Sequence, residues 1–181
     1  MEITTKFKDW LVIAQHSNFK MEKFTRPSYV AGVVTPANLF GLPLRQLISL
    51  SEIGDTDDSF YNVCESVLGL NHDDVDEARA VDVVRFVGWV SGELEKVNKM
   101  FEEVECGKPT DIEKRAGVET LRFGLFGMLD WFAQRMGIED HDQVLNYPWL
   151  RVYKCMDIDN KTNLYKVRLQ KLQAEEMRRK K

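Results

Sequence analysis

The sequence DVVRFVGWVSGELEKVNKMFEEV, residues 82–104, decides the fold class because its apolar side chains recur every three or four positions. This spacing places them on one face of an α-helix that packs against a core. Asp82 opens the segment with a negative charge, and the run Gly107-Lys108-Pro109 ends it. The sequence therefore predicts a long amphipathic helix. Its buried stripe should consist of Val83, Phe86, Val87, Val90, Leu94, Val97, Met100, Phe101 and Val104.

Shorter segments with the same helical spacing lie on both sides of this helix. The predicted fold class is therefore all-α: an irregular multi-helix bundle with an extended N-terminal arm and a basic C-terminal helix. A break or bend of the chain is expected at Asp159-Asn160, between the last two helices. The shorter helices are expected near residues 7–14, 44–50, 58–68, 149–156 and 161–181.

Another helix is expected from Thr110 to about Met136. It begins with a capping box, because Thr110 and Glu113 are spaced so that each side chain can bond the other residue's backbone N–H. Gly124 and Gly127 then lie three residues apart in its middle, where each costs about 1 kcal/mol relative to alanine. The pair predicts that another helix crosses closely at this point.

The stretch from Phe19 to Leu42 is irregular. It contains two prolines, two glycines and the short β-branched run Val33-Val34-Thr35, which is typical of an extended arm or a brief strand. Such an arm can pack on a neighbouring molecule or wrap around its own body. The spacing does not distinguish between these two arrangements.

The charge of the chain is unevenly distributed. The net charge is −4, but residues 161–181 carry eight basic and two acidic residues, so this tail is +6 and residues 1–160 sum to −10. We therefore divide the chain into a helical body, residues 1–160, which includes the arm 19–42, and a basic C-terminal helix or tail, residues 161–181. A protein partner, or a solvated helix end, is favoured for this tail over nucleic acid.

The composition suits a globular protein of a reducing compartment. The chain is 44% hydrophobic, and its three cysteines, Cys64, Cys106 and Cys155, form no C-x-x-C pair. The N-terminal residues contain no apolar signal-peptide core, and no apolar stretch is long enough to span a bilayer. We therefore expect a protein of the cytoplasm of the cell that produces it, without membrane contact.

No group of residues has the spacing of a catalytic or metal site. The histidines His16, His72 and His141 lie far apart in the sequence. The acidic runs 55–57 and 157–159 lack the glycine and glutamate that a calcium loop requires at its sixth and twelfth positions. Both glycine-rich phosphate-loop motifs are absent. The sequence therefore predicts no catalytic residue, no cofactor and no metal ion.

One part of the chain resembles a known family. The segment LRQLISL, residues 44–50, is followed by an acidic gap, by FYNVCESVLGL, residues 60–70, by Asp73-Asp74 and by the long helix. Over residues 39–104 this hydrophobic pattern resembles the tail assembly chaperones of tailed bacteriophages, which have a short L-x-x-L-I-x-L helix, a helix ending in L-x-G-L and a following D-V helix.

The resemblance implies a non-enzymatic helical protein of the bacterial host cytoplasm. Such chaperones coat the aggregation-prone tape-measure protein and help to recruit tail-tube subunits, and they have no catalytic residues to carry over. The arm and the basic tail are not part of the family pattern. They leave open a structural virion subunit, such as a neck, ring or tail component, whose arm and tail lock neighbouring copies into a homo-oligomer in the virion.

Two further hypotheses belong to other classes of protein. A nucleic-acid-binding regulator would use residues 161–181, and its binding would weaken steeply with salt. An enzyme of unrecognised type would need a pocket joining Cys64, His72 and Glu119, which the spacing does not support. The chaperone or adaptor, which would bind partner helices through apolar surfaces, is favoured over the other three hypotheses.

The residues expected to contact a protein partner lie in the last third of the chain. Large apolar side chains would act as anchors and basic side chains would steer the partner into place. For the aromatic residues of Tyr147-Pro148-Trp149, a place in the core remains an alternative. The predicted contact residues are Trp149, Tyr153, Leu164, Tyr165, Leu169, Leu172, Arg178, Arg179, Lys180 and Lys181.

Overall fold

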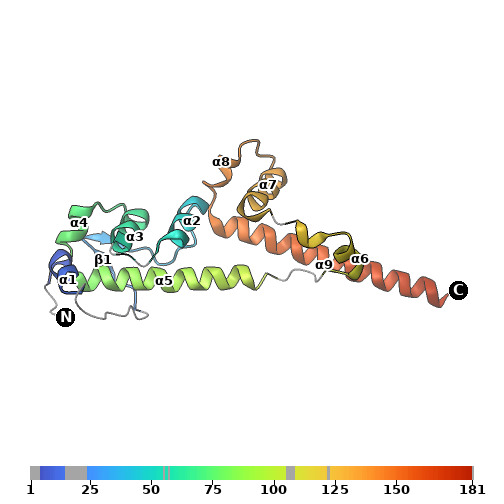
Figure 1. Cartoon of the computed structure of the whole chain (residues 1–181), viewed down its shortest axis with the longest axis horizontal. Helices are drawn as coiled ribbons and strands as arrows, with labels where there is room; N and C mark the ends of the chain where they lie inside the picture. The colour runs from blue at the N-terminus through green and yellow to red at the C-terminus, as the bar shows by residue number, and fades with distance from the viewer. Residues whose placement is uncertain are drawn as a thin grey trace. The chain divides into compact units, whose positions relative to one another are not determined.

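A computed structural model describes residues 5–14, 24–54, 56, 58–104, 109–121 and 123–180. In this part of the chain the structure is almost entirely helical, with one small two-stranded sheet, so the all-α prediction is confirmed (Figure 1). The α-helices are α1 (Phe7–Ala14), α2 (Leu44–Glu52), α3 (Asp58–Leu68), α4 (His72–Glu77), α5 (Ala80–Glu102), α6 (Asp111–Arg115), α7 (Gly124–Met136), α8 (His141–Val144) and α9 (Trp149–Arg179), with one 3-10 turn, η1 (Val118–Thr120).

The chain forms two compact units, which we describe separately. Unit 1 is Met1–Lys99 and unit 2 is Met100–Lys181, with the boundary near the end of α5. Of the basic tail expected at residues 161–181, the part up to Arg179 is the second half of α9, and Lys181 lies outside the described residues. An independent role for that tail stays a prediction.

The core of unit 1 forms around the predicted long helix, α5. Val83, Phe86 and Val90 of α5 are completely or almost completely buried, as the apolar spacing predicts. Phe7 of α1 is also fully buried, and its ring centroid lies 5.3 Å from that of Phe60 in α3. Burial of each such side chain contributes about 1.5–3 kcal/mol to stability, so these contacts hold α1, α3 and α5 together.

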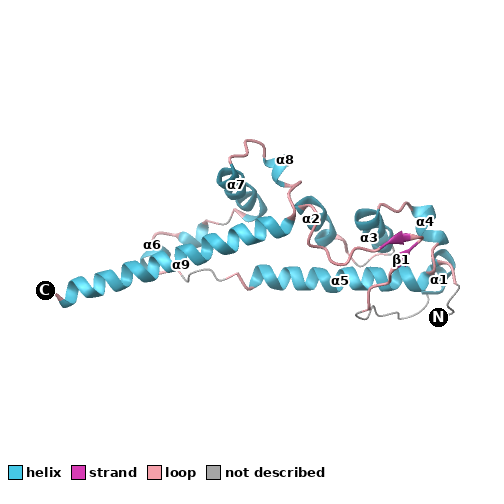
Figure 2. Cartoon of the chain, turned by 180° about the vertical axis from the view of Figure 1, so that it is seen from behind, coloured by secondary structure: helices cyan, strands magenta, loops and turns pink. Residues whose placement is uncertain are grey.

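The described part of the expected arm, residues 24–42, packs on unit 1. It forms a hairpin of β1 (Tyr29–Val30) and β2 (Val33–Val34), drawn in magenta in Figure 2. The turn residues Ala31 and Gly32 both have positive φ, which the common two-residue hairpin turns require. Val30 and Leu39 are buried in the core of the unit. The described part of the arm therefore wraps around its own body, which was one of the two arrangements left open by the sequence. Residues 19–23 of the expected arm lie outside the described part.

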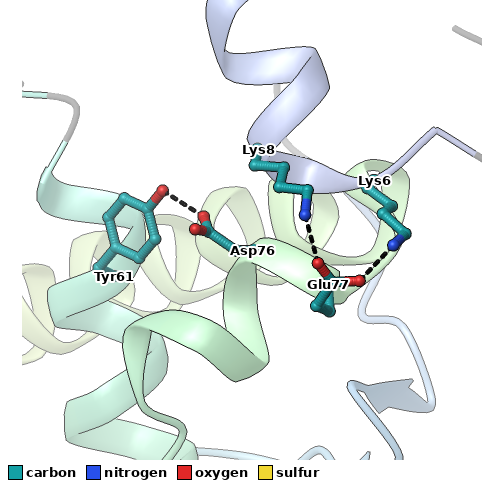
Figure 3. Close-up of polar contacts among 5 residues, drawn as sticks. All are labelled: Lys6, Lys8, Tyr61, Asp76 and Glu77. Carbon is teal, nitrogen blue, oxygen red and sulfur yellow. Dashed lines mark hydrogen bonds and ion pairs between the residues drawn. The ribbon is translucent and has the colours of Figure 1, made fainter.

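Polar contacts attach α1 to α4 at the edge of this core. The ammonium groups of Lys6 and Lys8 both donate to the carboxylate of Glu77, and the Tyr61 hydroxyl donates to Asp76 at 2.7 Å (Figure 3). Hydrogen bonds from the two lysines lower the pKa of Glu77 from 4.5 to about 2. Because Lys6, Lys8 and Glu77 are exposed to solvent, their ion pairs position α1 more than they stabilise it, whereas the part-buried bond between Tyr61 and Asp76 joins α3 to α4.

Replacing Glu77 with glutamine is expected to loosen α1. Because the folded-state pKa of Glu77 is lowered, its contribution is present above pH 4.5 and is lost as the pH falls toward 2. Hydrogen exchange of the Phe7 amide, which donates to the carbonyl of Ala78 at 2.9 Å, measures this opening. The ratio of exchange rates between E77Q and the unchanged protein should be largest at neutral pH and approach one near pH 2. If the ratio of exchange rates did not depend on pH, the ionised carboxylate of Glu77 would not be the group that holds α1 in place.

In unit 2 the helix expected from Thr110 to Met136 is interrupted, so that prediction is wrong. The chain forms α6, η1 and α7 in succession, with Gly117 at φ 85° and Gly124 at φ 56°. Both φ values are left-handed, which ends a helix and favours glycine. The capping box itself is confirmed, because the Thr110 N–H donates to Glu113 at 2.7 Å and the Glu113 N–H donates to Thr110 at 3.3 Å.

The close helix crossing expected at Gly124 and Gly127 is also wrong. A Cβ added at Gly124 would meet no atom within 4 Å, whereas one added at Gly127 would lie 2.5 Å from the Cβ of Phe123, just before its own helix. Gly124 is therefore needed for its φ value, and Gly127 leaves room for Phe123. The sequence spacing cannot reveal this, because a left-handed φ and a helix crossing both favour glycine.

This geometry predicts opposite effects for two glycine-to-alanine substitutions. At Gly92, in the interior of α5, an added Cβ meets no atom within 4 Å, so alanine should raise the free energy of unfolding by about 0.5–1 kcal/mol. At Gly127 the clash with Phe123 should outweigh the same gain and lower stability. Chemical denaturation of each variant measures both effects. Equal stabilisation by G92A and G127A would show that Phe123 moves aside without cost.

The break expected at Asp159-Asn160 is wrong as well, because α9 is one continuous helix of 31 residues. Asp159 pairs with Arg135 of α7, so its carboxylate is engaged away from the backbone of its own helix. The Lys161 ammonium also donates to the Asp157 carboxylate at 2.7 Å, an i, i+4 pair that spans the expected break and stabilises the helix there. Helix propensity is a weak preference that such contacts override.

Candidate protein-binding surface

The first half of α9 belongs to the core of unit 2. Trp149 and Val152 are completely buried. The ring centroid of Phe101 lies 6.0 Å from that of Trp149 and 5.4 Å from that of Tyr153, the latter edge to face. Such aromatic pairs add about 0.5–1.5 kcal/mol beyond the area they bury. This cluster fixes which face of α9 is covered.

The predicted contact residues therefore separate into two groups. Trp149 is a core residue and Tyr153 is half-buried against Phe101, so neither offers an open surface to a partner. Leu164 is half-buried. Helical spacing in the sequence could not distinguish the covered face from the open one. The exposed group consists of Tyr165, Leu169, Leu172, Arg178, Arg179 and Lys180, and Lys181 lies outside the described residues.

Four of the exposed apolar residues of α9 form one row, which begins at Ile158, before the basic tail. Ile158, Tyr165, Leu169 and Leu172 are 54%, 63%, 38% and 60% exposed. Their steps of seven, four and three residues place them on one face of the helix. We call these four residues the α9 stripe. Ile158 was missed in the sequence analysis, although its seven-residue step to Tyr165 was a detectable signal.

The charges around Tyr165, Leu169 and Leu172 of the α9 stripe are basic, whereas Ile158 lies between Asp157 and Asp159. Residues 160–174 contain Lys161, Lys166, Arg168 and Lys171 and no acidic residue. Lys161 bonds Asp157, and the charge of Lys171 acts with hydrogen bonds from Thr110 to lower the pKa of Glu113 in α6. Both views show α9 running past α6 to the end of the chain (Figures 1 and 2). The second half of α9 is therefore an open helix face with a positive potential.

A groove between α7 and α9 adjoins the stripe. Its volume is about 650 Å³. Apolar side chains from both helices line it together with polar residues of α9, and Thr162 lies in the same row as the stripe, between Ile158 and Tyr165. We call this cavity the α7–α9 groove. It is lined by Gly127, Met128, Trp131, Met156, Asp159, Asn160, Thr162, Asn163 and Lys166.

A second set of exposed apolar side chains precedes and begins α7. Four of its five members lie between residues 121 and 126, and contiguous exposed apolar side chains usually mark a contact surface. The prediction from the sequence did not include this set, because it assigned the region to one continuous helix. Its members are Ile112, Leu121, Phe123, Leu125 and Phe126.

Cys64 and His72, two of the three residues considered for an enzyme, pack as structural residues. Burial raises the pKa of the Cys64 thiol to about 12, so Cys64 stays protonated at neutral pH and is a poor nucleophile. The ring of His72 stacks on Tyr61 with centroids 4.2 Å apart. The side chain of Glu119 lies outside the described residues. Within the described chain, no three His, Cys, Asp or Glu side chains are placed to hold a metal ion.

None of the helices that the structure describes combines the length and the apolar character needed to cross a membrane. Comparison of the chain with models of protein families, with curated proteins and with solved structures finds no match.

Proposed function

We propose that this protein is non-enzymatic and acts by binding other proteins through the α9 stripe. Its specific role would be that of a tail assembly chaperone or adaptor for the tape-measure or tail-tube proteins of a tailed bacteriophage, in the cytoplasm of the bacterial host. The single observation that carries the proposal is the α9 stripe, four large apolar side chains in one row on an open helix. The hydrophobic pattern of residues 39–104 supports the family assignment.

Exposed apolar surface on α9 costs free energy that a bound partner recovers. Each Å² of apolar surface left in water forgoes about 25 cal/mol of stabilisation, which a partner recovers when it covers the stripe. Tyrosine and leucine on a rigid helix are suitable anchors, because a helix loses little conformational freedom on binding. A chaperone needs such a surface while it is free and must release it when assembly is complete.

Two measurements test the proposed function. Mass-resolved chromatography, with absorbance at two wavelengths and at low and high salt, should give a monomer or small oligomer free of nucleic acid. In cells infected by the phage that encodes the chain, the tagged protein should co-purify with tape-measure or tail-tube protein and be absent from finished particles. Salt-removable nucleic acid would favour a nucleic-acid-binding regulator instead, and failure to recover any tail protein would overturn the chaperone assignment.

A structural virion subunit is the second candidate, and a separate observation favours it. The exposed apolar residues 112–126 offer a contact surface on elements other than α9, and a subunit that joins two neighbours needs two such surfaces. This candidate expects a ring-sized oligomer and the presence of the protein in purified particles. The same chromatography and particle analysis therefore distinguish it from the chaperone.

A further inference from the structure

We infer that the partner of the α9 stripe is an acidic amphipathic helix, which lies along α9 and pairs with it in the manner of a coiled coil. This inference rests on the proposed function, because it names the class of partner for the same surface. Three observations carry it: the spacing of the stripe, the sign of the charge around it, and the position of the α7–α9 groove.

The spacing of the stripe is that of a coiled-coil seam. With Thr162 included, the row from Ile158 to Leu172 advances by steps of four, three, four and three residues. These steps average one seam position every three and a half residues, with Thr162 as the one polar member, which is the heptad repeat by which two helices interlock side chains along their length. A helix therefore fits this surface better than an extended strand, because a strand repeats with period two.

The charge beside the seam selects an acidic helix. In the same heptad numbering, the positions that flank the seam, where coiled coils place the charges that choose a partner, are basic in its middle, at Lys161, Lys166 and Arg168. The remaining flanking positions hold Asp159, which pairs with Arg135, and Gln173 and Glu175 at the far end. Residues 160–174 carry four basic residues and no acidic one. Glutamate or aspartate at the flanking positions of the partner would complement this charge, and lysine or arginine there would be repelled.

A second copy of the chain does not fit the same surface. Two α9 stripes brought together in either direction would place the basic residues of 160–174 opposite one another. Like charges at flanking positions weaken a coiled coil and act against self-pairing. The basic flanking residues therefore disfavour pairing between two α9 stripes. The stripe stays exposed on a free chain and can pair with a helix of opposite charge.

The α7–α9 groove provides an anchor point at one end of the seam. Thr162 and Lys166 line the groove and also lie in or beside the seam. Met128, Met156 and Trp131 line it as well, and methionine adapts to apolar groups of different shape. A bulky apolar side chain of the partner would enter here with a neighbouring carboxylate near Lys166. This anchor would fix the register of the partner on α9.

A pair of designed peptides tests the inference on the full-length protein. Both peptides repeat three heptads with leucine in the seam; one carries glutamate at every flanking position and the other carries lysine. Each is labelled with a fluorophore, and its anisotropy is followed as protein is added at low and high salt. The glutamate peptide should bind at least about tenfold more tightly than the lysine peptide, and added salt should reduce this preference. Equal binding, preference for lysine, or no binding would overturn the inference.

Matched variants locate the bound peptide. Leu169→Asp places a charge in the seam, whereas Val167→Asp places the same charge about half a turn away at a residue that is also exposed. L169D should weaken binding of the glutamate peptide by at least about tenfold and V167D should leave it nearly unchanged. Equal loss in both would mean that the stripe is not the site. Circular dichroism of each variant verifies that α9 is intact.

Charge reversal is the sharpest test of partner class. The double variant K166E/R168E should lose the preference for the glutamate peptide and bind the lysine peptide more tightly. In one outcome, the glutamate peptide does not bind, but tail proteins still co-purify with the unchanged protein and no longer do so with L169D. The inference of an acidic helical partner is then wrong, and the proposed function stands. If the glutamate peptide binds but no tail protein is recovered, the partner class stands and the chaperone assignment falls.

Discussion

A chain that ends at Asn160 is expected to lose its partner completely while the rest of the protein stays folded. The truncation removes Tyr165, Leu169 and Leu172 of the α9 stripe together with the basic residues around them. Each anchor of this kind contributes on the order of 1–2 kcal/mol or more, so binding should fall by at least about a hundredfold. The binding measurement is anisotropy with the acidic peptide, or recovery of tail proteins.

The fold should tolerate this loss, because the removed residues contribute little to the core. Among residues 161–180, only Leu164 is half-buried and all the others are exposed. The thermal unfolding midpoint should therefore change little. A second truncation, after Gln173, is the matched control, since it keeps the whole stripe and removes the distal segment 174–181, with its four basic and two acidic residues. It should weaken binding modestly, by slower association. Full affinity in the chain ending at Asn160 would exclude the stripe as the binding site.

Replacement of Trp149 with alanine should lower the free energy of unfolding of unit 2 by about 3–5 kcal/mol. Trp149 is completely buried and its ring lies against Phe101, so the substitution leaves a large cavity and removes the contacts that attach α9 to the start of the unit. Chemical denaturation, followed by circular dichroism, measures the change. The effect should be among the largest of any single substitution in this chain.

Tyr165→Ala is the control for this experiment, because it truncates an aromatic residue of the same helix that is 63% exposed. Stability should change by no more than about 0.5 kcal/mol, while partner binding should weaken. The two substitutions thus separate a core aromatic residue from an anchor. If W149A left stability unchanged and only reduced binding, Trp149 would be an interface residue, as its sequence context allowed.

Several elements could be predicted from short stretches of sequence. The buried stripe of α5 follows from the spacing of Val83, Phe86 and Val90, because a long amphipathic repeat is compatible with few other structures. The capping box of Thr110 and Glu113 is equally local, since both partners lie within one helical turn. The basic character of the second half of α9 required only the sequence.

Other features depend on φ values or on distant partners, and spacing alone did not reveal them. Gly124 interrupts the expected helix through a left-handed φ, which the residue type permits but does not require. Asp159 does not break α9, because Arg135 of another helix pairs with its carboxylate. The preference of Asp159 against a helix interior is worth about 1 kcal/mol or less, which a single tertiary contact can outweigh.

The candidate binding surface was likewise predicted in part from the sequence, and the rest required the tertiary structure. The sequence was sufficient to place apolar and basic residues at helical intervals in the last third of the chain, because that pattern lies within one helix. Only the tertiary structure decided that Trp149 faces the core and that Tyr165, Leu169 and Leu172 face solvent, joined by Ile158. The physical reason is that periodicity defines the faces of a helix, whereas burial of one face is decided by side chains such as Phe101 that are distant in the sequence.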